Sequence, residues 1–189
     1  IESIWSVGAT DESIVWASEA ATLAGQNLVQ ATTAPTPESR KAMSRASHLA
    51  GKAINISKTT APHALSYYLT SKHGIPHGMA VALTLSPMLA WNAEVTDSDC
   101  VDQRGAEHVR KRIAIICRIM QAADVQSACA NIEKLVADLD CPVTLAEAGI
   151  VDSQQIGRII DSVNMERMSN NPRSTTSEDL LDLLSGRTS

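Results

Sequence analysis

Apolar residues recur along most of the chain at the spacing of helices that bury one face. The segment from Gly78 to Asn92 is apolar on almost every side, which is typical of a helix at the centre of a bundle, and Pro87 is expected to kink it. Alternating runs rich in Val, Ile and Thr, the pattern of strands, are absent. The pattern therefore predicts an all-α fold, a helical bundle.

Capping and breaking residues indicate where these helices begin and end. Thr10, Thr36 and Thr176 are candidate N-caps, Pro37 suits a first helical position, and Gly74 is expected to stop a helix. The predicted helices cover about 11–28, 37 onward, 62–72, 78–92, 107–121, 126–139, 153–168 and 177 onward. No internal repeat or low-complexity linker divides the chain, so residues 1–189 are predicted to form a single domain.

Composition and charge exclude several classes of function. A net charge of −5 argues against a nucleic acid or an anionic membrane surface as partner, and the basic run Arg110-Lys111-Arg112 is expected to be a solvated helix surface. No apolar run is long enough to span a membrane. The four cysteines form no C-x-x-C pair, which argues against a cysteine zinc site and favours reduced thiols in a cytoplasmic protein.

His63 and His77 are the candidate metal ligands. On one helix, residues fourteen positions apart would lie about 21 Å from each other and could not share an ion. The G-I-P-H-G turn is expected to fold the chain back, so that the two imidazoles converge from neighbouring helices; imidazole suits iron(II) or zinc. From the residues alone, ordinary histidines that bind nothing remain the alternative, and His48, His73 and His108 are interpreted as surface residues.

Several motifs in order resemble the iron-containing (group III) alcohol dehydrogenases, which share a superfold with dehydroquinate synthase. They are I-E-S-I-W-S at the start, A-S-H-L-A-G, P-H-A-L-S-Y-Y-L, G-I-P-H-G-M-A-V-A-L, and N-N-P-R followed by T-S-E-D-L near the end. The resemblance covers nearly the whole chain. The segment T-T-A-P-H-A-L-S-Y is most similar to the branch of the family that reduces phosphonoacetaldehyde.

The resemblance implies a metal-dependent oxidoreductase of which this chain is the metal-binding helical half. In that family an Asp and a His four residues apart hold the metal together with two later histidines, which correspond here to His63 and His77. The Asp-x-x-x-His pair would then lie just before Ile1, and the domain that binds NAD or NADP would precede it. Because the chain begins with Ile1 rather than Met, we expect it to be a piece of a longer protein.

The expected chemistry is hydride transfer between a small primary alcohol or aldehyde and the nicotinamide, with iron as a Lewis acid and zinc as the alternative metal. The resemblance also implies a homo-oligomer. Many members carry a second histidine where Tyr67 stands here, so Tyr67 is a candidate catalytic residue; packing in the bundle is the other interpretation. Two different functions stay open: a non-catalytic helical interaction domain, and a metal domain complete in itself, which would need a carboxylate that converges on the histidines.

Overall fold

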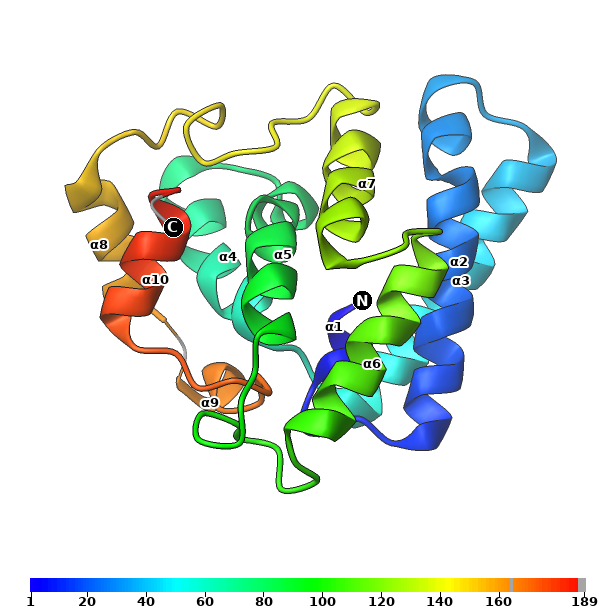
Figure 1. Ribbon diagram of the computed structural model, residues 1–189. Coiled ribbons are helices and arrows are strands. Elements are labelled where there is room, and N and C mark those ends of the chain that lie inside the picture. The colour runs from blue at the N-terminus through cyan, green and yellow to red at the C-terminus, as the bar shows by residue number, and fades with distance from the viewer. Residues whose placement is uncertain (164, 187–189) are drawn as a thin grey trace.

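The computed structural model describes residues 1–163 and 165–186, and helices build this part of the chain (Figure 1). Within these ranges the only β-pairing is an isolated antiparallel bridge between Cys100 and Arg173. The predicted all-α fold is therefore confirmed for the described chain. None of the described helices is long and apolar enough to cross a bilayer.

Two long helices, α2 (Asp11–Thr33) and α3 (Pro37–Ser57), run side by side along one side of the molecule (Figure 1). Each begins after its predicted threonine N-cap, whose hydroxyl accepts a hydrogen bond from the backbone N–H of Ser13 or Ser39. The two backbones approach closely because small side chains lie between them. The buried residues of the pair include Ile14, Ala17, Ala20, Ala46, Leu49 and Ala53.

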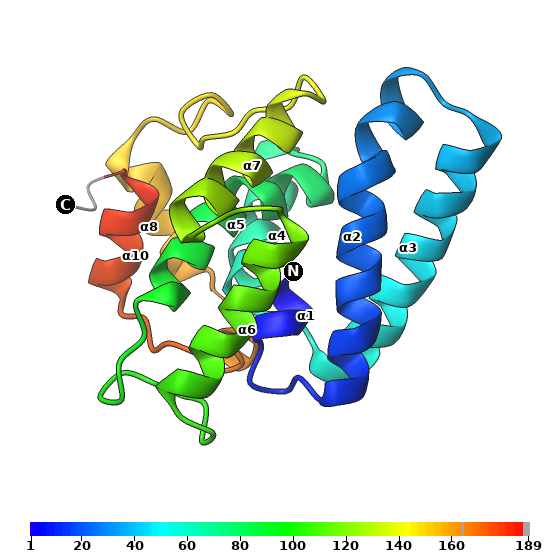
Figure 2. The ribbon, with the colours of Figure 1, turned by 45° about the vertical axis from the view of Figure 1, so that its right-hand side comes forward.

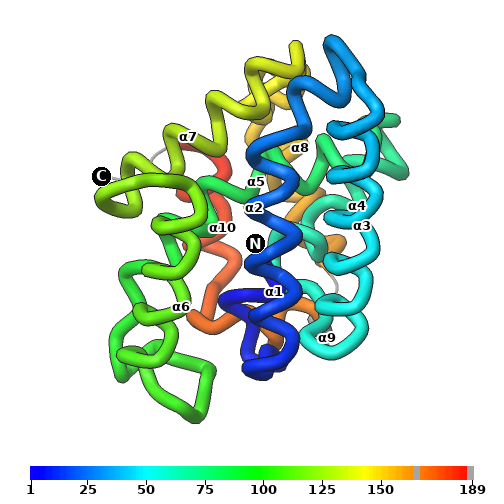
Figure 3. The backbone as a smooth tube through the Cα atoms, turned by 90° about the vertical axis from the view of Figure 1, so that its right-hand side faces the viewer, coloured from blue at the N-terminus to red at the C-terminus, as the bar shows by residue number. Residues whose placement is uncertain are grey.

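A second group of helices surrounds α5 (His77–Ala93). It contains α4 (Ala61–His73), α7 (Val125–Ala137), α8 (Ser153–Asp161) and α10 (Ser177–Leu184). Helix α5 contacts α4, α7 and α10, and it continues as one helix through its internal proline. This position confirms the central helix that the apolar segment predicted. In Figure 3 the α2–α3 pair faces the viewer, and this group lies behind it.

Helices α1 (Glu2–Trp5) and α6 (Ala106–Ile119) join the two groups. Helix α1 contacts α2, α3 and α6, while α6 also contacts α5 and α7. Figure 2 shows α1 between α6 and α2. Ile4 and Trp5 are almost completely buried in the core, so this short helix anchors the start of the chain between the two groups.

The structure corrects three expectations. The predicted helix 153–168 is wrong, because α8 ends at Asp161 and a separate short α9 covers Met165–Met168; residue 164 lies outside the described residues. The Ser162 hydroxyl donates to the carbonyl of Ile159 at 2.7 Å, a local bond that competes with the helix ladder. Helix α2 continues five residues past the predicted end at 28, until the residue before Pro35 leaves the helical region.

The third correction concerns the basic run on α6. The side chain of Arg112 is only 13% exposed, pairs with Asp11 at 3.1 Å and donates to His108 at 3.2 Å. Neither Arg112 nor His108 is therefore a freely solvated residue, although Lys111 is largely exposed. Burial and the nearby arginines lower the pKa of His108. All four cysteines are free thiols in the structure, in agreement with the sequence prediction.

Candidate functional site

His63 lies in the first turn of α4, and the chain enters this turn through strained backbone. Lys58, directly after α3, has a φ of 59°, a value that is costly for a residue other than glycine. Pro62 then occupies the first turn of α4, where the missing N–H loses no helical hydrogen bond. Thr60 is the N-cap, but its hydroxyl does not cap the helix. That hydroxyl is used elsewhere in the site.

Glu2 of α1 is the partner of both Thr60 and His63. One carboxylate oxygen contacts Nδ1 of His63, and the other accepts hydrogen bonds of 2.8 Å from the backbone N–H and the hydroxyl of Thr60. The Thr60 hydroxyl in turn accepts a 2.9 Å bond from Nε1 of Trp5. Burial acts to raise the pKa of Glu2, but the bonds from His63 and Thr60 outweigh it, so the pKa is lowered.

The Glu2 carboxylate decides which nitrogen of His63 can bind a ligand. An ionised carboxylate only accepts hydrogen bonds, so Nδ1 must carry a proton, and Nε2 of the neutral ring keeps its lone pair. Histidines that bind metals usually make this contact with a carboxylate or carbonyl through their other nitrogen. No local pattern indicates this role, because Glu2 is a single acidic residue in an apolar segment and lies 61 residues from its partner.

His77 is the first residue of α5 and faces His63. Gly74 ends α4 in a left-handed conformation with φ of 69°, and the short connection after it returns the chain to the middle of α4. The two imidazole centroids are 5.2 Å apart with the planes at 72°, so the predicted convergence from neighbouring helices is confirmed. Nδ1 of His77 lies 3.4 Å from the Ser66 hydroxyl. Among the described residues, neither ring has a hydrogen-bond partner at Nε2.

Tyr67 lies one helical turn after His63, and its ring centroid is 5.8 Å from that of His77. The tyrosine is 42% exposed, and no described residue forms a hydrogen bond with its hydroxyl. The guanidinium of Arg167 lies over the ring, with Cζ 4.8 Å from the centroid, and donates a 2.8 Å bond to the Thr59 hydroxyl. No local pattern singles out Arg167, because its contacts are about a hundred positions away in the chain.

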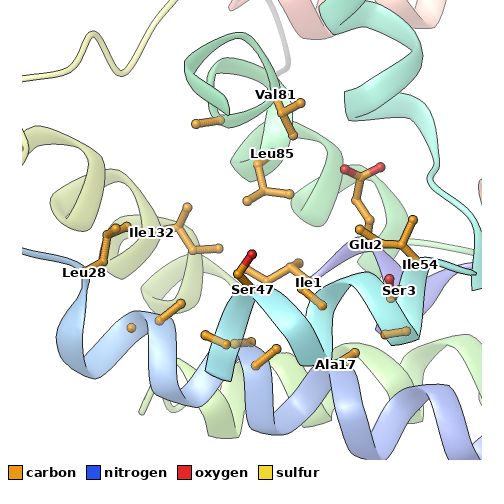
Figure 4. Close-up of a pocket in the computed structure, with 18 of the residues that line it drawn as sticks. Ile1, Glu2, Ser3, Ala17, Leu28, Ser47, Ile54, Val81, Leu85 and Ile132 are labelled. Atoms are coloured by element: carbon orange, nitrogen blue, oxygen red, sulfur yellow. The ribbon is translucent and has the colours of Figure 1, made fainter. Parts of the chain in front are cut away.

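A cavity of about 430 Å³ lies between the α2–α3 pair and helices α5 and α7, and most of its lining is apolar (Figure 4). Val81 and Leu85 reach it from α5, and Figure 4 shows the Glu2 carboxylate at its edge. Thr59 and His63 also belong to the lining. One side of the histidine site therefore borders an apolar space.

The donor set of the site is partial. In residues 1–163 and 165–186, no group of three or more His, Cys, Asp or Glu side chains is placed to hold a metal ion. Glu2 does not complete such a group; its carboxylate contacts Nδ1 of His63, and Nε2 of that ring is left for a ligand. Two available imidazole nitrogens fit half of a four-ligand shell for iron or zinc, provided that other residues supply the rest.

The sequence of the chain is similar to those of known proteins. Residues 1–187 match the family described as Fe-containing alcohol dehydrogenase family, C-terminal. The chain is 35% identical over 187 residues to phosphonoacetaldehyde reductase of Streptomyces viridochromogenes, an alignment that covers 98% of this chain and 46% of that protein. The chain thus spans about half the length of this relative.

Solved structures share the fold. Sulfoacetaldehyde reductase from Bifidobacterium kashiwanohense, in complex with NAD+, is 28% identical with a TM-score of 0.81, covering 97% of this chain and 45% of that one. An alcohol dehydrogenase from Oenococcus oeni has a TM-score of 0.82 at 22% identity, covering 98% and 47%. The helical bundle is therefore that of the C-terminal half of these enzymes, and the chain belongs to the Fe-containing alcohol dehydrogenase family.

Proposed function

We propose that this chain is the metal-binding half of an oxidoreductase that interconverts a primary alcohol and an aldehyde with a nicotinamide cofactor. The observation that carries the proposal is the convergence of His63 and His77, together with the Glu2 carboxylate on Nδ1 of His63. A site that binds nothing has no need to hold one imidazole with a buried carboxylate, because burial of that charge is costly. Family membership supports the same chemistry.

His63 and His77 would bind the metal ion through Nε2. The family name favours iron, and zinc is the alternative for such ligands. The other two ligands would be the Asp and His of an Asp-x-x-x-His pair just before Ile1. When bound, the ion supplies a Lewis acid that polarises the aldehyde oxygen or lowers the pKa of the alcohol. Glu2 fixes the orientation and the tautomer of His63.

A nucleotide-binding domain before Ile1 would hold NAD or NADP, and this chain would supply the other wall of the site. Tyr67 lies beside His77 and is 42% exposed, and its phenol hydroxyl suits proton transfer to or from the substrate oxygen. The relatives are named for phosphonoacetaldehyde and sulfoacetaldehyde. We therefore infer a short aldehyde that carries an acidic group as the substrate class.

The metal content and turnover of the full-length protein test this proposal. His63→Ala and His77→Ala should each remove most of the bound metal and abolish the reduction of short aldehydes, since a metal–nitrogen bond of about 2 Å cannot be replaced by a methyl group. His48→Ala is the matched control, because His48 is exposed on α3. Full metal content and full turnover in the His77→Ala protein would contradict the ligand assignment. A wild-type protein that binds no metal and reduces no aldehyde would instead favour a non-catalytic helical domain.

A further inference from the structure

Arg167 lies along the same face of α4 that carries the candidate site. Thr59, His63 and Tyr67 are four positions apart, so they share one side of the helix and of the turn that leads into it. Arg167 spans this side, with a bond of 2.8 Å to the Thr59 hydroxyl at one end and the stacking contact of 4.8 Å on the Tyr67 ring at the other. Its positive charge is therefore held beside Tyr67, whose ring centroid lies 5.8 Å from that of His77.

The chemistry of the Arg167 guanidinium makes this position suitable for an anion. The buried Glu2 carboxylate keeps its negative charge, but the printed bonds of its two oxygens are to His63 and Thr60 rather than to Arg167. A guanidinium is always charged and carries five N–H donors in a planar fork that matches the oxygens of phosphate-like groups. The contact with the Tyr67 ring and the bond from one guanidinium nitrogen to Thr59 hold this group in place.

We propose that Arg167 binds the acidic group of the substrate, a phosphonate or a sulfonate at the end of a short aldehyde whose carbonyl reaches the His63–His77 pair. This inference rests on the proposed function and names the residue that selects the substrate class. The Tyr67 ring lies 4.8 Å from the guanidinium and 5.8 Å from the His77 ring, so one side chain separates the two ends of the site. A substrate with few atoms between its carbonyl and its anion suits this short path.

Steady-state kinetics of the full-length enzyme test the assignment. Arg167→Met keeps a long, flexible stem and removes the charge, and Arg45→Met is the control, because Arg45 is 65% exposed and pairs with Glu19 on the α2–α3 pair. The substrates are phosphonoacetaldehyde, sulfoacetaldehyde and the neutral propanal. We expect Arg167→Met to raise KM for the two acidic aldehydes about 10- to 100-fold, the scale of a hydrogen bond to a charged group. KM for propanal should stay within about twofold, and melting temperatures should show that all variants fold.

Direct binding separates this inference from the proposed function. Calorimetry with 2-hydroxyethylphosphonate, the alcohol product, should show binding to the wild-type protein and to Arg45→Met but much weaker binding to Arg167→Met. An equal rise of KM for propanal and the acidic aldehydes would overturn the anion site and leave a purely structural contact. Turnover of propanal without any preference for acidic aldehydes would overturn it while the oxidoreductase function stands.

If no aldehyde is reduced, the proposed function fails, and the calorimetry alone decides on the anion site. Phosphonate binding that is much weaker in Arg167→Met than in the wild-type protein supports the anion site. Equal binding to both proteins overturns it. The ratio of kcat/KM for the two acidic aldehydes then tells whether the phosphonate or the sulfonate is the better fit. Arg167→Lys, which keeps the charge but loses the planar fork, should lie between the wild type and Arg167→Met.

Discussion

Replacement of Glu2 by Gln tests whether a buried carboxylate prepares His63 for a metal ion. The native carboxylate accepts on both sides, from Nδ1 of His63 and from the N–H and hydroxyl of Thr60. A glutamine amide has one accepting and one donating end. If its oxygen faces Thr60, its NH₂ group donates to Nδ1 of His63, and the proton of the neutral ring must move to Nε2. The nitrogen that should bind the metal then has no lone pair.

The opposite orientation of the amide is no better. With its oxygen on His63, the NH₂ group would face the N–H of Thr60, and the two donors would repel each other. Loss of a carboxylate that orients a metal-binding histidine typically reduces metal affinity 10- to 100-fold. The Glu2 side chain is 7% exposed and accepts three bonds, each worth about 1.5 to 3 kcal/mol when one partner is charged. Glu2→Gln should therefore also lower the free energy of unfolding by about 2 kcal/mol.

Two measurements check this prediction. Competition with a chelator gives the metal affinity of the full-length protein, and the nitrogen chemical shifts of His63 report its tautomer in the 189-residue chain. Glu133→Gln is the control, because Glu133 is exposed in the middle of α7. Glu2→Gln with wild-type metal affinity and Nδ1 still protonated would refute the reasoning, whereas a change of stability alone would reduce Glu2 to a structural role.

Two further predictions concern Tyr67 and Asp102. Tyr67→Phe should lower turnover about a hundredfold if the hydroxyl transfers a proton. The melting temperature should change by less than about 2 °C, because the tyrosine is half-exposed. An unchanged turnover rate would show that Tyr67 only packs against its neighbours. Burial acts to raise the pKa of Asp102, but its bonds with Arg104 outweigh this and lower the pKa below the ordinary 3.8. The stability that the ionised Asp102 adds is thus fully present above pH 3.8 and is lost as the pH falls through its lowered pKa in the folded protein. Asp102→Asn should therefore reduce the melting temperature at pH 7 and reduce it progressively less in acid. A difference that is the same at pH 7 and pH 3 would contradict the ion pair as its source.

Most of the fold could be predicted because its signals are local. Thr10, Thr36 and Thr176 begin their helices as predicted, and each forms a capping box with the residue three positions later. Gly74 ends its helix in the left-handed conformation that glycine adopts at low cost. The turn after it also predicted the approach of His63 and His77, since one short connection fixes the relation of two neighbouring helices.

The missed features depend on contacts between distant segments. Helix α1 has four residues, too few for any hydrophobic period, and its burial comes from packing against α2, α3 and α6. Glu2 and Arg167 reach the site from opposite ends of the chain. Neither belongs to a motif with a known spacing, so no local pattern could connect them with α4 before the helices were placed in space.

The segment that leads into α4 departs from ordinary preferences of backbone conformation and helix capping. The hydrogen bonds of Glu2 explain why the chain tolerates this. Lys58 has a positive φ, and Thr60 leaves the N-terminus of α4 without its cap, which costs about 1 kcal/mol. The same Thr60 hydroxyl instead donates to Glu2 and accepts from Trp5, so each bond polarises the next. These bonds to a buried charge offset the lost cap, and their effect is to fix the His63 ring. Unfavourable local conformations are expected at sites that bind a ligand, where side chains are placed for binding rather than for the stability of the helix. Here these conformations lie around one imidazole, that of His63.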